Sequence, residues 1–484
     1  MSITHLEPKS LWQHFADLNA VPRPSKKEER VIQFMVDFGN KLNLSTQVDK
    51  IGNVIIKKPG TAGMESLDAV ILQSHLDMVH QKNNDTDFDF LTQGIEMYVD
   101  GDWVKVKGTT LGADNGLGVA AIMALLSSTD IPHPPLEAMF TIDEETGMTG
   151  AKKLEGQYYQ GKTLLNLDTE DDDELSIGCA GGIDTNTTYT YSKVAIKPDH
   201  SGLSVTVKGL QGGHSGMDII KGLGNANKML NRILYNLNKQ HQFQLLSFDG
   251  GSLRNAIPRE AVAVIAVANV KLDAVKESIQ EVAQEVINEF KTLEPNMVVP
   301  VENASIDGMY AVDPADFEKI NKTLYAVHNG VFRMSPDIEG LVETSSSLAR
   351  VIIKDGEFTT QSLQRSSVES TKDDIATTIR CTFESMGCEV NQGGDYPGWQ
   401  PNPDSKILRT MEQLYKDLFK EEPQIKACHA GLECGILGQH LPGVDMISFG
   451  PNIRGAHSPD EKVQISSVQK FWKFLLATLA DMKN

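Results

Sequence analysis

The stretch AVILQSHLDMVHQ, residues 69–81, is an apolar run that turns polar toward its end. Its first part has the pattern of a buried strand, and the polar side chains of Ser74, His75 and Asp77 follow. Successive side chains of a strand point to opposite faces, so His75 and Asp77 point the same way. An isolated His-x-Asp is also compatible with a hydrogen-bonded histidine beside a turn. The rest of the chain has to decide between these interpretations.

Further acidic and imidazole side chains occupy comparable places: most follow an apolar run, and Asp114 lies in a Gly-flanked turn just before a small-residue helix. They are Asp114 in TTLGADNGLGVAAIM, Asp143, Glu144 and Glu145 in LEAMFTIDEETG, Asp168 in TLLNLDTED, and His457 in VDMISFGPNIRGAHSPDE. Taken alone, Asp114 is equally compatible with a helix N-cap. Together these residues stand at the carboxyl ends of successive strands, where open α/β sheets place their ligand crevices. The pattern favours a common site.

The residue types in this group are typical of a metal site. Two histidines and several carboxylates, without cysteine, suit Zn²⁺, with Mn²⁺ or Co²⁺ as substitutes. Two ions about 3.5 to 4 Å apart need an anionic bridge, which a carboxylate supplies. Five ligands fit such a pair, and a remaining acid is free to act as general base. Position alone does not separate Glu144 from Glu145 in that role.

The order of apolar and helical patterns predicts an α/β catalytic domain interrupted by an α+β insert. Residues 1–186 alternate strand-like and helical segments, which is typical of a mainly parallel sheet covered by helices. Residues 187–398 form the insert, whose strand pattern predicts an antiparallel sheet and whose weak self-similarity indicates two similar units. Residues 399–484 return to the catalytic domain.

The composition excludes several classes of protein. The chain has 484 residues, of which 40% are hydrophobic, and a formal net charge of −20 without a basic stripe, so a nucleic-acid partner is not expected. It contains no signal-peptide pattern and no apolar run of about 20 residues. Five cysteines without a C-x-x-C pair argue against a disulfide framework and a thiolate metal site. We therefore expect a cytoplasmic protein that does not bind membranes.

The motifs SHLDMV, GADNGLGVA, DEETGMTGA, LDTED, GGHSG and GAHSPDE occur in this order. This series resembles the signatures of the aminoacylase, carboxypeptidase and peptidase T superfamily of dinuclear zinc hydrolases. In detail it is similar to the bacterial aminoacyl-histidine dipeptidases, also called Xaa-His dipeptidases or bacterial carnosinases. The resemblance covers essentially the whole chain.

The resemblance implies a role for each candidate residue. His75 and Asp168 would hold one Zn²⁺, Glu145 and His457 the other, and Asp114 would bridge the two ions of each subunit. Asp77 would orient His75, Glu144 would be the general base on the metal-activated water, and His214 would stabilise the oxyanion. Asn255, Arg365 and Gly431 would belong to the substrate-binding site, with Asn255 and Arg365 holding the substrate's carboxylate. His429 and Glu433 match the family near the rim of the site, without an assigned role.

The resemblance also implies that residues 187–398 are a lid and dimerisation domain of two ferredoxin-like units. We therefore expect a dinuclear zinc dipeptidase that hydrolyses unblocked dipeptides, preferably Xaa-His and including β-alanyl-histidine, and that forms a homodimer through its lid domain. The alternative within the superfamily is an aminoacylase or carboxypeptidase-type hydrolase, which a comparison of free and N-acetylated dipeptides would reveal. A non-enzymatic metal-binding protein is a more distant alternative, which the acid beside the ligand set argues against.

Overall fold

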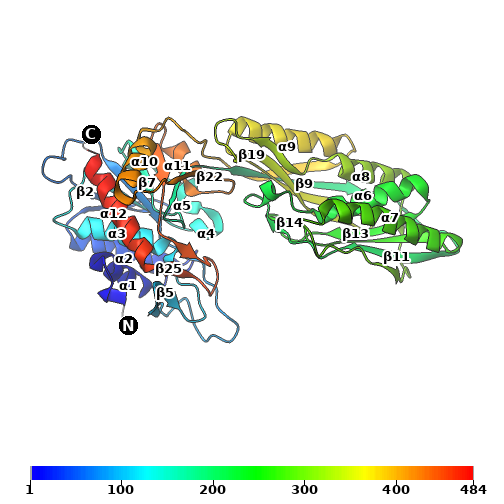
Figure 1. Cartoon of the computed structure of the whole chain (residues 1–484), viewed down its shortest axis with the longest axis horizontal. Coiled ribbons are helices and arrows are strands. Elements are labelled where there is room, and N and C mark those ends of the chain that lie inside the picture. Colours follow the sequence, from blue (N-terminus) through cyan, green and yellow to red (C-terminus); the bar gives the residue numbers. More distant parts are fainter. Residues whose placement is uncertain (1–2, 483–484) are drawn as a thin grey trace. The chain divides into compact units, whose positions relative to one another are not determined.

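The computed structural model describes residues 3–482 and divides the chain into two compact units. Unit 1 contains the residues up to Gly178, Trp399–Ala427 and the residues from Leu432 onward, and unit 2 contains Cys179–Gly398 and Cys428–Gly431. We predicted the first boundary at residues 186/187, but that position lies inside strand β9 (Gly181–Thr190), which pairs with β20 and β21 of unit 2. The boundary therefore falls before this strand (Figure 1).

Unit 1 is built on an eight-stranded sheet in the order β1-β2-β6-β3-β7-β23-β8-β22. Its strands are β1 (Ser45–Val48), β2 (Val54–Lys58), β3 (Val70–His75), β6 (Leu136–Thr141), β7 (Thr163–Asn166), β8 (Glu174–Cys179), β22 (Gln424–Cys428) and β23 (Asp445–Ser448). The four central strands β6, β3, β7 and β23 are parallel, whereas β1, β2 and β8 pair antiparallel with their neighbours. The parallel part of the sheet is thus confined to its centre. A short turn is enough to return β1 to β2, whereas each parallel pair needs a crossover.

The helices of unit 1 pack on this sheet and on each other. They are α1 (Lys9–Asn19), α2 (Glu29–Lys41), α3 (Ala113–Ser127), α4 (Glu144–Gly147), α5 (Thr149–Lys152), α10 (Lys406–Phe419), α11 (Glu433–His440) and α12 (Ile465–Asp481), with short 3₁₀ turns at Ile3–His5 and Gly156–Tyr158. Helix α3 packs against both α1 and β3 and is buried along nearly its whole length, which explains its uniformly small and apolar sequence. Its first turn carries Asp114.

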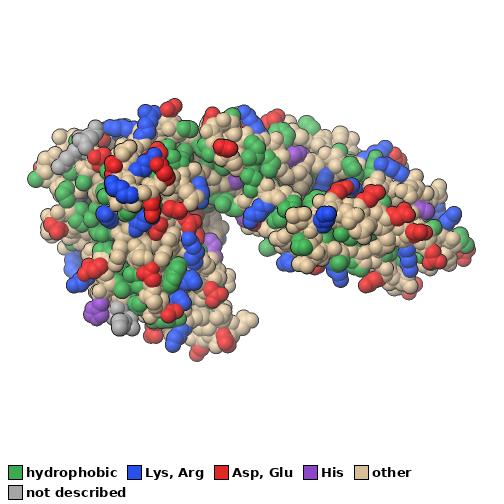
Figure 2. All heavy atoms as spheres, viewed as in Figure 1, with side chains coloured by type: hydrophobic (Ala, Val, Ile, Leu, Met, Phe, Trp, Pro, Cys, Tyr) green, Lys and Arg blue, Asp and Glu red, His purple; other side chains and the backbone are tan. Residues whose placement is uncertain are grey.

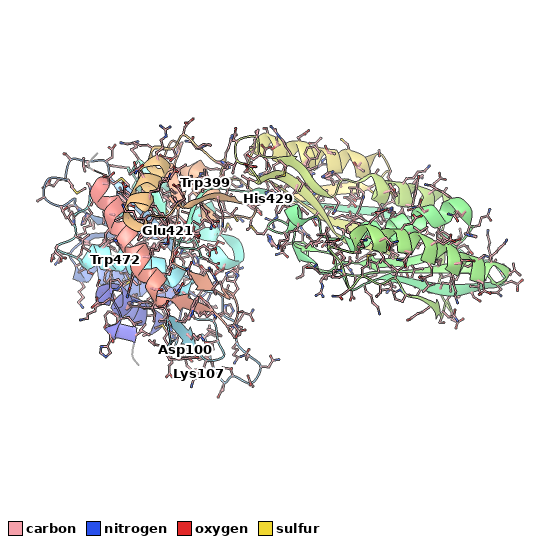
Figure 3. All side chains as sticks on the ribbon, in the orientation of Figure 1. Asp100, Lys107, Trp399, Glu421, His429 and Trp472 are labelled. Atoms are coloured by element: carbon pink, nitrogen blue, oxygen red, sulfur yellow. The ribbon has the colours of Figure 1, made fainter. Side chains whose placement is uncertain are left out.

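A second, four-stranded sheet of unit 1 has the order β24-β25-β5-β4. Its strands are β4 (Met97–Asp100), β5 (Trp103–Val106), β24 (Ile453–Arg454) and β25 (Lys462–Gln464). Figure 3 labels Asp100 at the end of β4 and Lys107 just beyond β5. The sheet joins the C-terminal loop that contains His457 to the hairpin of β4 and β5, so that loop is held between two paired strands.

Unit 2 contains two βαββαβ arrangements joined edge to edge, as expected for two ferredoxin-like units. The first is β11 (His200–Val207), α6 (Ala226–Gln240), β13 (Gln244–Gly250), β15 (Ala261–Ala268), α7 (Leu272–Phe290) and β16 (Val301–Ala304). The second is β9, α8 (Pro314–Ala326), β19 (Val342–Lys354), β20 (Glu357–Ser366), α9 (Glu369–Glu384) and β21 (Glu389–Tyr396), so the first arrangement is inserted after β9. Pairing of β13 with β19 makes one sheet of the two, in the order β16-β11-β15-β13-β19-β20-β9-β21, with β18 (Gly330–Met334) paired to β19.

One hydrophobic core serves both halves of unit 2. It joins apolar side chains of all four helices to one face of the sheet, and Phe248, Leu348 and Phe358 are among its buried members. The helix starts follow from local sequence: Asn225 caps α6, and Asp313 followed by a proline caps α8. Short strands complete the unit, namely β10 (Lys193–Val194), β12 (Gly213–His214), β14 (Ala256–Ile257) and β17 (Ala311–Val312), with 3₁₀ turns at Ile219–Lys221 and Asn269–Lys271.

Charged side chains are mixed over the surface. Figure 2 shows acidic and basic groups interspersed on the viewed face, despite the formal net charge of −20. No helix within residues 3–482 combines the length and the apolar character that crossing a membrane requires.

Candidate metal centre

The candidate ligands meet because three parallel strands end at the same level. The register pairs His75 of β3 with Thr141 of β6, and Gln73 of β3 with Asn166 of β7. Residues that directly follow these pairs therefore emerge together at the carboxyl edge of the sheet. Asp168 comes two residues after Asn166, and the acidic run DEE begins two residues after Thr141.

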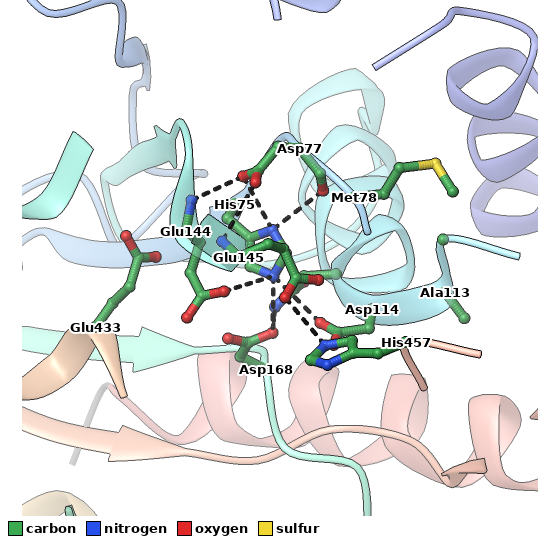
Figure 4. Close-up of polar contacts among 12 residues, drawn as sticks. His75, Asp77, Met78, Ala113, Asp114, Glu144, Glu145, Asp168, Glu433 and His457 are labelled. Carbon is green, nitrogen blue, oxygen red and sulfur yellow. Dashed lines mark hydrogen bonds and ion pairs between the residues drawn. The ribbon is translucent and has the colours of Figure 1, made fainter. Parts of the chain in front are cut away.

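Asp114 lies between the two histidines (Figure 4). One of its carboxylate oxygens is 3.1 Å from Nε2 of His75, and the other is 3.1 Å from Nε2 of His457. His75 is also 3.6 Å from a carboxylate oxygen of Asp168, and His457 is 3.0 Å from Oε2 of Glu145. The structure therefore brings all five predicted ligand side chains into one cluster, arranged as two pairs on either side of Asp114.

Asp77 holds the second nitrogen of His75. The backbone carbonyl oxygen of Asp77 is 3.2 Å from Nδ1 of His75, and its Oδ1 is 3.4 Å from the same nitrogen. The two carboxylate oxygens accept the backbone N–H groups of Glu144 and Glu145 at 3.0 and 3.3 Å. Nδ1 of His75 thus faces Asp77, and its Nε2 faces Asp114 and Asp168. One buried carboxylate orients the imidazole and also fixes the first turn of α4.

Glu144 and Glu145 are adjacent but have different neighbours. Glu145 is turned toward His457, and its side chain is 3% exposed. Glu144 approaches His75, with Oε2 at 4.0 Å from Nε2, and its side chain is 14% exposed. Short helix α4 begins at Glu144, separated from the strand by only Ile142 and Asp143, so the two side chains diverge. The sequence contained no signal for this divergence.

The electrostatics of the cluster are those of a cation site. Burial, with the nearby charges of Asp114 and Glu433, raises the pKa of Glu144 and Asp168 well above the ordinary values, although His75 acts in the opposite direction. Hydrogen bonds to Asp114 and Glu145 raise the pKa of His457 to about 11. Buried Oε1 of Glu145 has no hydrogen-bond partner among the described residues. Crowded carboxylates and an unpaired buried oxygen fit divalent metal ions.

A ladder of buried, hydrogen-bonded polar side chains crosses the parallel strands beside the candidate ligands. We define it as Thr141, Gln73, Asn166 and Ser448, one residue from each of the parallel strands β6, β3, β7 and β23. Gln73 donates to Thr141 at 3.1 Å, Asn166 donates to Gln73, and Ser448 donates to Asn166. These residues are at most 1% exposed, so their polar groups depend on one another. Gln73 and Asn166 each lie two residues before a candidate ligand, on the same face of their strands.

Glu433 closes one end of this ladder. One of its oxygens accepts hydrogen bonds from Gln73 and Thr141, both at 2.7 Å, and the side chain is 1% exposed. The family resemblance placed Glu433 only near the rim of the site. Its burial could not be foreseen, because its hydrogen-bond partners lie 292 and 360 residues away in the sequence.

The family model for "Peptidase family M20/M25/M40" matches residues 71–481, a span that contains all of these side chains. The chain belongs to peptidase family M20/M25/M40. This M20 peptidase is 40% identical over 480 residues to the Escherichia coli (strain K12) protein called cytosol non-specific dipeptidase, covering 99% of each chain. It is 42% identical to the aminoacylhistidine dipeptidase of Vibrio alginolyticus, whose crystal structure it matches with a TM-score of 0.94 over 99% of this chain and 98% of that chain.

A more distant match concerns the fold of the M20 peptidase alone. The aminopeptidase PepT of Bacillus cereus is 14% identical and matches with a TM-score of 0.58 over 99% of this chain and 100% of that chain. The expected fold class and the expected family are therefore both confirmed.

The other predicted site residues of the M20 peptidase all belong to unit 2. His214 lies in β12, and Arg365 in β20 has one Nη 3.4 Å from His214 Nε2 and the other 2.9 Å from the hydroxyl of Tyr396. Asn255 is exposed and accepts a backbone hydrogen bond from Ser215 at 2.8 Å. Gly431 is half-buried at the end of the segment Cys428–Gly431. Tyr396 was not among the predicted site residues.

The imidazole of His214 is held in one tautomer. Its Nδ1 accepts the backbone N–H groups of Gly216 and Met217 at 3.2 and 3.0 Å, so Nδ1 carries no proton. Burial and the Arg365 charge lower the pKa of His214 below its ordinary value. The neutral ring then has its proton on Nε2, so His214 is a hydrogen-bond donor at that atom. Arg365 can only donate as well, so its 3.4 Å contact with Nε2 is not a hydrogen bond in this tautomer.

His429 (Figure 3) is a buried anchor of unit 2. Its Nε2 is 2.8 Å from the hydroxyl of Ser345, and the side chain is 6% exposed. Burial, followed by the charges of Arg365 and His214, lowers the pKa of His429 to about 3. The ring therefore stays neutral in the folded protein at the pH values at which an unfolded chain takes up a proton.

This difference predicts a pH dependence of stability. Below pH 6.5 the unfolded chain protonates His429 and the folded chain does not, so folding stability falls with pH and is fully retained only above pH 6.5. Between pH 6.5 and 5 the loss from this residue should be about 2 kcal/mol. Between pH 7 and pH 5, we expect His429→Gln to lose less free energy of unfolding than the wild type, because this contribution is absent from the variant. Urea unfolding at the two pH values measures the difference. An unchanged pH dependence in the variant would contradict the prediction.

Proposed function

We propose that this M20 peptidase is a dinuclear metal dipeptidase that cleaves unblocked dipeptides, including Xaa-His dipeptides such as β-alanyl-histidine. The observation that carries the proposal is the placement of Asp114 between the pairs His75–Asp168 and Glu145–His457. Support for the substrate class comes from two full-length relatives at 40% and 42% identity that are both named dipeptidases. Neither of them is named an aminoacylase or a carboxypeptidase, so the dipeptidase activity is preferred.

Two Zn²⁺ ions per subunit are the proposed cofactors, with Co²⁺ or Mn²⁺ as substitutes. His75 and Asp168 would hold one ion, Glu145 and His457 the other, and Asp114 would contribute one oxygen to each. Two histidines with oxygen ligands are a donor set that zinc accepts. When bound, such ions polarise a carbonyl group and lower the pKa of water.

The protein's own groups would carry out the proton transfers. Glu144 would accept a proton from the attacking water and deliver it to the leaving amine, because its carboxylate lies 4.0 Å from His75, farther from a histidine than the carboxylates of the proposed ligands. Asp77 would keep His75 in its orientation by holding Nδ1. The Nε2–H of His214 would donate to the oxyanion that develops from the substrate carbonyl. Asn255, Arg365 and Gly431 would hold the rest of the substrate, with Arg365 offering paired donors to its carboxylate.

The test of the substrate assignment is the release of free histidine from β-alanyl-histidine. Metal-stripped protein is assayed before and after addition of Zn²⁺, beside other free dipeptides and an N-acetylated dipeptide. We expect activity to return as about two ions bind per subunit, and the acetylated substrate to be rejected. Two bound ions without histidine release would overturn the Xaa-His assignment, and preference for the acetylated substrate would identify an aminoacylase.

The donor role of His214 has its own test. His214→Ala is expected to lower kcat about 10²-fold or more and to leave metal content unchanged, since one oxyanion donor is worth that much. Kinetics and metal analysis of the same preparations measure the two effects. His200→Ala, at the half-buried start of β11, is the matched control in the same unit. A kcat equal to that of the control would remove His214 from the mechanism.

We also propose a cytoplasmic homodimer with no nucleic-acid or membrane partner. The name of the Escherichia coli relative places that protein in the cytosol, and no two cysteines of the described residues form a disulfide. Among the described residues, edge strand β18 of unit 2 pairs only with β19. Its side chains Phe332 and Met334 are 40% and 42% exposed. Such an edge supports association through unit 2, the predicted lid. Light scattering of the purified chain tests the dimer.

A further inference from the structure

The loop that leads to Asp114 is held by the buried carboxylate of Glu461, which is 3% exposed. Its Oε2 accepts the backbone N–H groups of Leu111 and Gly112 at 2.7 and 3.0 Å. Its Oε1 accepts those of Ala113 and Asp114 at 2.7 and 3.3 Å. Burial raises the pKa of Glu461 to about 7, whereas the backbone N–H groups favour the ionised form, in which these hydrogen bonds are strongest. The backbone of Asp114 is thus fixed by a residue that lies four positions after His457.

Arg23 holds the carbonyl groups of the same loop. It is 1% exposed, and its Nη2 donates to the carbonyl oxygen of Gly112 at 2.6 Å. Its Nη1 donates to the carbonyl oxygens of Leu76 and Asp77, both at 3.0 Å. These are the backbone groups that directly follow His75. Arg23 therefore links the backbone beside His75 to the backbone beside Asp114.

Gly112 makes this close approach of Arg23 possible. Its backbone has φ of +69°, which disfavours residues with a Cβ atom. A Cβ built at Gly112 would lie 2.6 Å from Arg23 Nη2 and 2.9 Å from the sulfur of Met78. Only glycine therefore lets the loop sit against the guanidinium group.

We infer that Arg23, Gly112 and Glu461 form a backbone clamp that positions His75, Asp114 and His457 for metal binding. None of the three has a side chain in the ligand set proposed above, so they are positioning residues. The inference rests on that ligand set and adds residues that act through the backbone. Because Asp114 lies between both pairs of ligands, loosening the clamp should weaken the binding of both ions.

A purely structural role is the competing explanation, since any buried carboxylate that accepts backbone N–H groups stabilises a fold. Glu137 provides the comparison. It lies in β6 of the same unit, is 4% exposed, and accepts the N–H groups of Gln160 and Gly161 at 2.8 and 2.9 Å. It pairs with Lys57 and makes no contact with the ligand loops among the described residues. Metal affinity separates the two roles, because a variant that is less stable but still folded keeps its Zn²⁺ affinity when the ligands are not displaced.

The experiment compares Glu461→Gln with Glu137→Gln in the full chain. An amide has one acceptor oxygen and turns its NH₂ toward backbone donors, so it cannot reproduce the four hydrogen bonds. We expect Glu461→Gln to weaken Zn²⁺ binding about 10- to 100-fold, measured by competition with a chromophoric chelator. The absorption spectrum of the Co²⁺-loaded protein should change as well. Glu137→Gln should lower the unfolding midpoint and keep wild-type Zn²⁺ affinity.

A glycine pair tests the clamp without altering a charge. Gly112→Ala should weaken Zn²⁺ binding, because the added methyl displaces the loop from Arg23. Gly101 in the turn between β4 and β5 has a similar φ of +60°, and a Cβ added there meets nothing within 4 Å. Gly101→Ala therefore carries comparable backbone strain and should keep wild-type Zn²⁺ affinity.

The outcomes are distinct. Wild-type Zn²⁺ affinity and an unchanged Co²⁺ spectrum in a folded Glu461→Gln protein would overturn the clamp, even if that protein were less stable. If Glu461→Gln does not fold, Gly112→Ala decides by the same readouts. A wild-type chain that binds neither Zn²⁺ nor Co²⁺ would overturn the proposed function itself, and that result is obtained before any variant is compared.

Discussion

Replacing Glu144 with glutamine is expected to lower kcat for dipeptide hydrolysis by about 10²- to 10⁴-fold, the contribution of a positioned general base. Glutamine keeps the size of the side chain but cannot accept a proton. The metal content should stay at the wild-type value, because Glu144 approaches only His75, at 4.0 Å, and is not turned toward His457. Steady-state kinetics and elemental analysis of the same preparation measure both quantities.

The neighbouring Glu145 supplies the matched comparison for this experiment. Its carboxylate contacts His457 at 3.0 Å, so Glu145→Gln is expected to lose metal as well as activity. Loss of metal in Glu144→Gln together with full metal in Glu145→Gln would mean that the two roles are exchanged. Near-normal kcat in Glu144→Gln with bound metal would exclude Glu144 as the base.

The second large effect concerns Asp114. In Asp114→Asn only one side-chain oxygen remains, so one carboxylate no longer serves both histidine-containing pairs. We expect both ions to be lost or greatly weakened, and activity to fall about 10³- to 10⁴-fold, because metal-ion catalysis contributes several kcal/mol. Titration with Zn²⁺, followed by calorimetry, measures the binding directly.

Asp173→Asn is the control for a change of charge near the site. Asp173 belongs to the acidic run after Asp168, and its carboxylate accepts a hydrogen bond from Gln424 at 2.6 Å instead of facing a histidine. Its variant should bind Zn²⁺ as the wild type does. An Asp114→Asn protein with two tightly bound ions would show that Asp114 is not the bridge.

The cluster of polar strand ends was predictable because parallel strands present their carboxyl ends at one edge. His75 and Asp168 illustrate this, since each follows an apolar run and their strands are direct neighbours. The family resemblance was needed for the division of roles between Glu144 and Glu145. The short helix that begins at Glu144 rotates the two side chains apart, and no periodicity in the sequence encodes that rotation.

The residues that support the ligands could not be predicted in this way. Arg23 and Glu461 bind backbone atoms, and backbone atoms have no sequence signature. Arg23 reaches Gly112 across 89 positions, and Glu461 reaches Leu111 across 350. Glu461 lies inside the motif GAHSPDE, yet its role follows only from the four N–H groups that face it.

The four-residue segment Cys428–Gly431 belongs to unit 2, although the chain on both sides of it belongs to unit 1. It is fixed there by hydrogen bonds from the amide of Ala180 to the carbonyl groups of Cys428 and Ala430, and by the contact of His429 with Ser345. Unit 2 therefore cannot be removed as one continuous segment of the chain. A recombinant protein that joins residue 178 to residue 399 would retain residues 428–431. It would lack Ala180 and Ser345, which bind this segment. Exchange of this unit between homologues, in the laboratory or during evolution, would have to transfer both pieces together.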